Sequence, residues 1–382
     1  AVAEDDFTVV LTLNTPTFWF LNTLASVGIV PEHAYSEGYG TNPAVTSGPY
    51  KFVEWRSQEQ LVMEANENYY GEVPAIKNVV VVFMGEDAAL AAVQAGQVDA
   101  AITSATLAVN QINGYHIEEI STADCRGFTL PVLPAEGKVA QNGAPIGNDV
   151  TSQIEIRQAI AYALDRDLIA DVALNGYATP AFSENDGMPW NNPAVKIETN
   201  VEYAKQLLAD AGWADTDGDG IVEKDGLKAE FSCVYPASDS ARQAILLASV
   251  EQLKAVGINV IPEGLSWDEI SLKMFSSAVM MGWGAANPSE TYFLYQSEGA
   301  LLDDYYNPEG HMSEVTDGYL EAARQALTPE EAYENFRKVQ WDGETGTAMI
   351  GECPWVWIVN LDHVYFIRDG LDIGDQYVHP HG

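Results

Sequence analysis

Apolar runs alternate with helix-like patterns along most of the chain. Residues 79–83 form a continuous apolar run, typical of a strand buried on both faces, and residues 98–102 have the length of a second strand. Between these two strands, Asp87 and Gly96 are expected to begin and end a helix. A strand–helix–strand unit of this kind predicts two parallel strands joined by a right-handed crossover.

The second half of the chain repeats this alternation. Helix starts are predicted by a capping box at residues 152–155, by Asn200, and by the hydroxyl–proline–acid sequence that begins at Thr328. Apolar stretches at residues 228–235 and 355–359 predict strands. Helices and strands that alternate in this way indicate an α/β fold.

Two further segments give clear expectations. Residues 115–150 have little helical pattern and several Pro and Gly residues, so irregular structure is expected there. After the capping box, Ile160, Leu164, Leu168 and Val172 recur at helical spacing, which predicts one helix with all four side chains facing inward.

Composition and charge exclude one class of partner. The chain has 382 residues, of which 47% are hydrophobic, so roughly two to three folded domains are expected. Lys and Arg number 18 against 56 Asp and Glu, a net charge of −38. Phosphate backbones are held by clustered cations, so we expect no nucleic-acid partner and interpret the acid excess as a source of solubility and self-repulsion. No apolar run approaches the roughly 18 residues of a membrane span.

No catalytic motif is present: the sequence lacks a nucleophile elbow, an HExxH helix, a phosphate-binding loop and a GxGxxG fingerprint. Carboxylates are abundant, but their spacing selects no pair. A carboxylate-dependent hydrolase therefore stays open as the alternative of another class.

One loop has the spacing of a calcium site. Asp215, Asp217 and Asp219 supply oxygens at positions 1, 3 and 5, and Glu223 stands at position 9. Position 12 is Gly226, where a calcium loop has its bidentate acid. The loop is a candidate calcium site, with an acidic β-turn as the alternative, and no other resident cofactor is expected.

Aromatic residues gather in a segment rich in Gly, Asn and Pro. The cluster consists of Trp283, Tyr292, Tyr295, Tyr305 and Tyr306. Rings with polar tips are common in ligand clefts, so this segment is a candidate ligand site, with core packing as the alternative.

Four motifs, in the right order, resemble the family 5 extracellular solute-binding proteins, which are the peptide- and nickel-binding subunits of ABC importers. They are TSGPYKF at 46–52 followed by EANENYYG at 64–71, QAGQVD at 94–99, IRQAIAYALDR at 156–166 and YAKQLLADAGW at 203–213. The resemblance implies a two-lobed, type II periplasmic-binding-protein-like fold with mixed sheets flanked by helices, which binds its ligand between the lobes.

On the family's layout, residues 1–42 are expected to be the tail of an extra N-terminal domain. Residues 43–149 and 351–382 would form lobe I and residues 150–350 lobe II. The chain is expected to be a fragment that lacks its N-terminal part. The full-length protein would be a monomer outside the cytoplasm, periplasmic or lipid-anchored at the cell surface, that delivers its ligand to the permease subunits of an ABC importer.

The resemblance also bears on the ligand. Peptide-binding relatives have an aspartate shortly after their Gly-Trp pair, where this chain has Ala286. Burying an ammonium group without its carboxylate is costly, which disfavours a peptide bound in that manner. Trp283-Gly284-Ala285 resembles instead the nickel-binding relatives, whose tryptophan covers a nickel–chelator complex. We therefore expect a nickel–chelate or related metal complex, with a di- or oligopeptide as the alternative.

The predicted ligand-contacting residues are Trp283, Tyr292, Tyr295, Arg126 and His311. His311 is placed by the resemblance near the loop histidine that touches nickel in the relatives, with a solvated imidazole as the alternative. The chelator-binding arginine of those relatives has no counterpart here, because the first arginine in the chain is Arg56. No catalytic residue is expected, and the chain is predicted to be a binding protein and not an enzyme.

Overall fold

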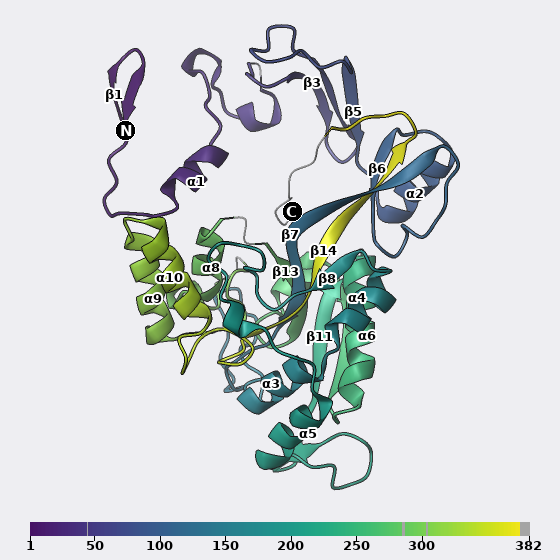
Figure 1. Cartoon of the computed structure of the whole chain (residues 1–382), viewed down its shortest axis with the longest axis vertical. Helices are drawn as coiled ribbons and strands as arrows, with labels where there is room; N and C mark the ends of the chain where they lie inside the picture. The colour runs from purple at the N-terminus through teal and green to yellow at the C-terminus, as the bar shows by residue number, and fades with distance from the viewer. Residues whose placement is uncertain (44, 285–286, 303–304, 375–382) are drawn as a thin grey trace. The chain divides into compact units, whose positions relative to one another are not determined.

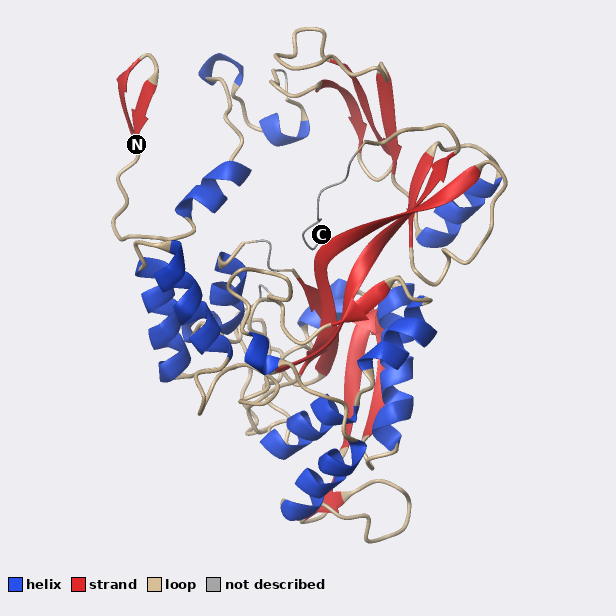
Figure 2. Cartoon of the chain, in the orientation of Figure 1, coloured by secondary structure: helices blue, strands red, loops and turns tan. Residues whose placement is uncertain are grey.

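The computed structural model describes residues 1–43, 45–284, 287–302 and 305–374 (Figures 1 and 2). The chain divides into two compact units: unit 1 comprises Ala1–Phe20 and Asp99–Gly382, and unit 2 comprises Leu21–Val98. The three predicted domains, with their boundaries after residues 42, 149 and 350, stay a prediction.

Unit 2 is built on a three-stranded antiparallel sheet. Its strands, in the order in which they pair, are β3 (Tyr50–Arg56), β4 (Gln60–Ala65) and β5 (Asn78–Val82). Its helices are α1 (Phe20–Ser26), η1 (Glu32–Ala34), η2 (Tyr39–Thr41) and α2 (Glu86–Gln94). The helix predicted between Asp87 and Gly96 is therefore confirmed as α2, but the predicted start is wrong, because α2 begins at Glu86 after Gly85 and has no side-chain cap.

The prediction of a strand buried on both faces is wrong for β5. Val80 is 52% exposed and Val81 is 40% exposed, although they point to opposite faces of the sheet. The predicted parallel crossover is also wrong. The strand after α2, β6 (Ala100–Thr103), pairs antiparallel with β14 (Trp355–Arg368) in the sheet of unit 1. An apolar run indicates a need for burial, but it does not identify the partner that supplies it.

Unit 1 contains a seven-stranded mixed sheet. Its remaining strands are β7 (Tyr115–Thr129), β8 (Ala178–Pro180), β11 (Glu230–Pro236), β12 (Asn259–Leu265) and β13 (Ala278–Trp283). The order is β12-β11-β13-β7-β14-β6, and β8 also pairs with β14. Strand β11 is parallel to β12 and β13, whereas β7, β14, β6 and β8 join the sheet through antiparallel pairs.

The expectation of irregular structure is wrong for the first part of residues 115–150, because β7 is a 15-residue strand. Every residue from 123 to 129 is buried. A strand buried on both faces has no polar–apolar alternation, so the pattern that would have indicated it is absent.

Helices flank this sheet (Figure 2). The α-helices are α3 (Ile154–Ala163), α4 (Arg166–Leu174), α5 (Val201–Asp210), α6 (Ser240–Lys254), α7 (Trp267–Ser271), α8 (Ser289–Tyr295), α9 (Glu314–Gln325) and α10 (Pro329–Gln340). The short elements are the pairs β1 (Val2–Asp5) with β2 (Thr8–Val10) and β9 (Glu223–Lys224) with β10 (Leu227–Lys228), and the 3-10 turns η3 (Pro193–Val195) and η4 (Ser297–Gly299).

Two of the three predicted helix starts are confirmed. The side chains of Asn200 and Thr328 accept hydrogen bonds from the third backbone N–H of α5 and α10. The capping box at 152–155 is wrong: α3 begins at Ile154 with no side-chain cap, and Glu155 pairs with Lys224 instead.

The single helix predicted from Ile160 to Val172 is two helices. Leu164 has an extended backbone, and the Asp165 side chain accepts a hydrogen bond from the backbone N–H of Leu168 to start α4. The helical spacing is therefore interrupted, and Leu168 and Val172 are exposed while the first two predicted core residues are buried.

Candidate functional site

The candidate site lies where two parallel strands of the unit 1 sheet end. Strands β11 and β13 are parallel neighbours, so their carboxyl ends meet at one edge of the sheet. Trp283 is the last residue of β13 and lies opposite Cys125 of β7, whose thiol donates a hydrogen bond to the Trp283 carbonyl. The helix α8 begins six residues later, so this edge carries the segment in which the aromatic residues are concentrated.

Trp283 is half-buried and fixed at both ends of its ring. Its indole N–H donates to the Glu290 carboxylate at 2.8 Å, and its ring centre lies 4.6 Å from that of Tyr306. Phe293 continues the row, 5.4 Å from Tyr306 and 5.6 Å from Tyr292. A half-buried, held aromatic surface of this kind can cover a flat or apolar ligand group.

The predicted aromatic cluster is thus brought together only in part. Tyr292 is half-buried against Trp19, with ring centres 5.1 Å apart, and Trp19 itself is 5% exposed in the core of unit 1. Tyr305 packs edge-on against Trp267 at 5.5 Å and donates its hydroxyl to the Trp267 carbonyl. Tyr292 therefore packs largely against the core of unit 1, as the alternative prediction for these rings states. Ala285 and Ala286, on which the ligand argument depended, lie outside the described residues.

Tyr295 and His311 lie in the interior, where their rings are not accessible to a solute in this structure. Tyr295 is 1% exposed and donates its hydroxyl to the Glu184 carboxylate at 3.1 Å. His311 is 3% exposed, and its Nε2 contacts the Glu352 carboxylate. A solvated imidazole, the alternative for His311, is wrong, because Glu352 and the backbone contact with Asn307 hold the residue inside. Burial opposes ionisation of Glu352, but the hydrogen bond and charge of His311 outweigh it and lower the pKa of that carboxyl.

Arg126 lies next to Trp283 but on the other face of the sheet. It pairs with Gly282 across the β7–β13 ladder, one residue before Trp283, and successive residues of a strand point to opposite faces. Arg126 is 7% exposed and forms an ion pair with Asp124. A Cβ atom at position 282 would overlap its guanidinium group, so glycine is needed there.

A second arginine adds to this charge cluster. Arg242, in the first turn of α6, forms an ion pair with Asp239. Burial, together with the nearby positive charge of Arg126, lowers the pKa of Arg242 to about 10. Asp124, Asp239 and Arg242 were not predicted, because the sequence does not show that the start of α6 lies near β7.

A buried acid was also missed. Glu184 accepts hydrogen bonds from Asn185, Thr291 and Tyr295, and burial raises the pKa of its carboxyl to about 7. Its three donors satisfy both carboxylate oxygens, so the group acts as a structural link between the segment before Trp190 and helix α8.

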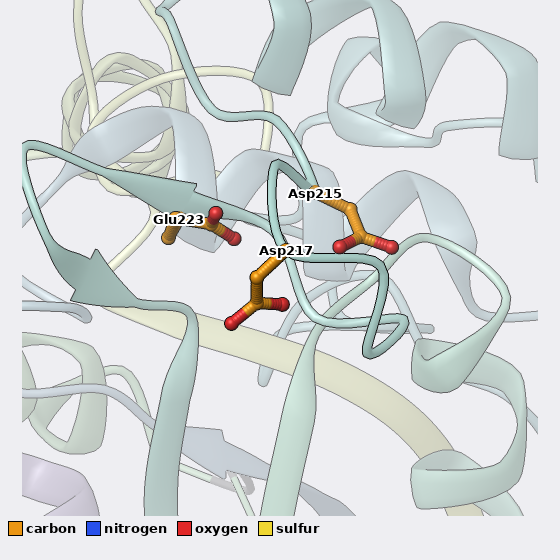
Figure 3. Close-up of side chains that lie close together, drawn as sticks. All are labelled: Asp215, Asp217 and Glu223. Carbon is orange, nitrogen blue, oxygen red and sulfur yellow. The ribbon is translucent and has the colours of Figure 1, made fainter.

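Figure 3 shows three carboxylates of the candidate calcium loop, Asp215, Asp217 and Glu223, which lie close together. One carboxylate oxygen from each of Asp215, Asp217 and Glu223 lies within 4.8 Å of the others. However, the Lys228 ammonium forms ion pairs with Asp217, at 2.8 Å, and with Asp219. Two of the four carboxylates of the loop therefore already pair with a cation of the chain itself, and calcium binding there stays a prediction.

Solved structures of other proteins share the fold of this chain. The fold is shared with NikZ from Campylobacter jejuni in complex with Ni(L-His), with a TM-score of 0.81, 22% identity and 97% of this chain covering 73% of that one. It is also shared with the oligopeptide-binding protein AppA from Bacillus subtilis in complex with a nonapeptide, with a TM-score of 0.72, 23% identity and 96% of this chain covering 72% of that one. The fold is thus the α/β fold of periplasmic binding proteins.

The family follows from sequence. The model described as "Bacterial extracellular solute-binding proteins, family 5 Middle" matches residues 1–300, so the chain belongs to this family. Protein XP55 of Streptomyces lividans is 28% identical over 383 residues, which cover 97% of this chain and 66% of that protein. AppA of Bacillus subtilis is 29% identical over 298 residues, which cover 73% of this chain and 53% of that protein.

The chain therefore spans between about half and two thirds of the length of these curated relatives. Within the part of the chain that the structure describes, no helix combines the length and apolar character needed to cross a membrane.

Proposed function

We propose that this chain is the larger part of an extracytoplasmic solute-binding protein that captures a small ligand and delivers it to the permease subunits of an ABC importer. Membership of the family supports this assignment. The protein acts as a carrier, so its ligand is released unchanged and no residue is assigned a catalytic role. We place the full-length protein outside the cytoplasm, either free or lipid-anchored at the cell surface.

The first candidate ligand is a nickel–histidine type complex or a related metal chelate. The observation that carries this choice is the half-buried indole of Trp283 at the carboxyl end of β13, held by Glu290 and Tyr306. A flat aromatic surface of this kind suits the planar rings of a chelate. Ala286 supports the same choice, since this position has no carboxylate for a peptide ammonium group.

A di- or oligopeptide is the second candidate. It is favoured by the 29% identity to AppA of Bacillus subtilis, an oligopeptide-binding protein. In this case the tryptophan would cover an apolar side chain of the peptide.

Tryptophan fluorescence and calorimetry on the 382-residue chain separate the two candidates. The probes are Ni²⁺ alone, L-histidine alone, the two together, and a mixture of peptides. We expect the combination to bind more tightly than either component, and Trp283→Phe to remove the fluorescence change. Trp55→Phe, at an exposed tryptophan of unit 2, is the matched control.

Binding of peptides with no response to nickel would reverse the ranking of the two ligands. Sustained turnover in a screen of glycosides and peptides would replace the carrier proposal with the carboxylate-dependent hydrolase.

A further inference from the structure

The polar edge of the Trp283 ring is joined to a carboxylate. The indole N–H donates to Glu290, seven residues later in the chain, at 2.8 Å. Glu290 is half-buried and belongs to the first turn of α8. A carboxylate offers roughly four acceptor positions, so one indole N–H does not exhaust its capacity for hydrogen bonds. Glu290 therefore orients the ring and also places a negative charge at the edge of the ring.

The rings beside this carboxylate form a surface that suits a cation. Tyr306 lies 4.6 Å from Trp283 and Phe293 lies 5.4 Å from Tyr306, measured between ring centres. Phe293 is 39% exposed, and Trp283 and Tyr306 are half-buried. The face of an aromatic ring attracts a positive charge, most strongly in the case of Trp. We call Trp283, Tyr306, Phe293 and Tyr292 the aromatic row.

Charges near the end of the aromatic row add to the negative potential. The strongest charges that act on the Tyr292 hydroxyl are those of Glu321, Arg324, Glu298 and Asp317. Three of these four groups are carboxylates, and the guanidinium group of Arg324 forms an ion pair with Glu321. The four groups together therefore contribute a net negative charge beside the row.

Arg126, the cation beside Trp283 in the sheet, does not offset this charge. It lies on the other face of the sheet, and its guanidinium group forms an ion pair with the buried Asp124. Arg242 forms an ion pair with Asp239 in the same way. Because each of these cations has a carboxylate of its own, the charge of Glu290 acts on the face of Trp283 without compensation from them.

We propose that Glu290 is a specificity-determining residue of the candidate ligand site, and that its carboxylate selects a solute with a positively charged group that stacks on Trp283. The aromatic row supplies the stacking surface, and the carboxylate at its edge supplies the charge and a hydrogen-bond acceptor. This inference rests on the proposed solute capture and adds to it the charge of the solute.

Two kinds of solute share this chemistry. A complex of one Ni²⁺ with one L-histidine anion has a net positive charge, and a peptide has an ammonium group at its amino end. A chelate with several carboxylates, such as nickel–EDTA, has a net negative charge, and Glu290 together with the neighbouring acids repels it. Charge therefore separates the solutes that this site accepts from those that it rejects.

Fluorescence quenching of Trp283 tests the charge without a ligand. The signal of Trp283 is the difference between the 382-residue chain and the same chain with Trp283→Phe. It is quenched with caesium, iodide and neutral acrylamide at constant ionic strength, and acrylamide corrects for accessibility. We expect the ratio of caesium to iodide quenching to fall about twofold in Glu290→Gln, the size expected for one unit charge a few ångström away after screening by salt.

Further variants separate the charge from the structure. In Glu290→Gln the side-chain oxygen still accepts from the indole N–H, so the ring keeps its place. Glu290→Asp keeps the charge on a shorter side chain and is expected to keep the ratio. Glu202→Gln is the matched control, because this carboxylate is 85% exposed on α5, and the ratio is expected to stay unchanged. An unchanged ratio in Glu290→Gln, or an equal fall in Glu202→Gln, overturns the inference.

Calorimetry identifies the source of the positive group. The probes are Ni²⁺ with L-histidine, nickel–EDTA, and one peptide with a free or an acetylated amino end. Glu290→Gln is expected to weaken binding of the cationic probe about tenfold, as for the loss of a hydrogen bond to a charged group. A loss with nickel–histidine assigns the metal complex, and a loss with the free peptide alone assigns the ammonium group. Tighter binding of nickel–EDTA than of nickel–histidine, or an equal loss with the acetylated peptide, overturns the role of Glu290.

The two proposals fail separately. A native chain that binds none of these probes removes the proposed solute capture, while the quencher ratio still decides whether Glu290 favours cations at Trp283. Equal binding of a cationic probe by the native chain and by Glu290→Gln keeps the solute capture and overturns the role of Glu290.

Discussion

Glu184 makes the stability of unit 1 depend on pH in a direction that can be worked out in advance. The ordinary pKa of its carboxyl is 4.5, and burial raises it to about 7 in the folded chain. Between these two values the unfolded chain has released the proton and the folded chain still holds it. The free energy of unfolding therefore falls as the pH rises from about 4.5 to about 7, and this group has no further effect above that.

The size of the effect follows from the same shift. A difference of about 2.5 pKa units corresponds to about 3 kcal/mol at about 1.4 kcal/mol per unit. Because Glu184 is 4% exposed, screening by water does not reduce this figure greatly. In Glu184→Gln, the side-chain oxygen still accepts from Thr291 or Tyr295, but the group no longer titrates.

Urea unfolding at pH 5, 6, 7 and 8, followed by far-UV circular dichroism, measures this contribution. The loss of stability from pH 5 to pH 8 is expected to be smaller in Glu184→Gln than in the native chain by up to about 3 kcal/mol. The exposed Glu72→Gln controls for removal of one negative charge and is expected to leave the pH dependence unchanged. Parallel curves for the native chain and Glu184→Gln would refute the reasoning.

Three further predictions concern packing, charge and metal binding. Gly282→Ala forces the Arg126 guanidinium aside and is expected to lower the free energy of unfolding in urea by about 1–3 kcal/mol. Gly318→Ala, in α9 with open space around it, is expected to raise that free energy by about 0.5–1 kcal/mol, and equal effects of the two substitutions would contradict the packing argument. The melting temperature should rise between about 0.1 M and about 1 M NaCl. The screening length falls from about 10 Å to about 3 Å over this range, which weakens the self-repulsion of a chain with net charge −38. A melting temperature that does not change with salt would argue against this repulsion. Calcium should bind only at millimolar concentration, since Lys228 competes for Asp217, and more tightly in Lys228→Ala; no calorimetric heat from either protein would remove the calcium prediction.

The sequence by itself determined the family, several of the helices and the starts of two of them. Asn200 and Thr328 cap α5 and α10 as predicted, since a cap depends on backbone groups only three residues away. The end of β13 at Trp283 was not predicted, because the sequence presented Trp283 only as one ring of an aromatic cluster in a segment rich in Gly, Asn and Pro.

The tertiary structure alone decided which residues share a surface. Tyr295 and His311 were predicted to face a ligand, but Glu184 and Glu352, more than 40 residues away in sequence, hold them inside. Arg126 and Trp283 lie side by side in the sheet yet face opposite ways, because the pairing register of β7 and β13 fixes their sides. The strands that pair with β5 and β6 also could not be predicted from the sequence. Strand pairing and burial depend on segments far apart along the chain, whereas caps and helical spacing depend on a few neighbouring residues.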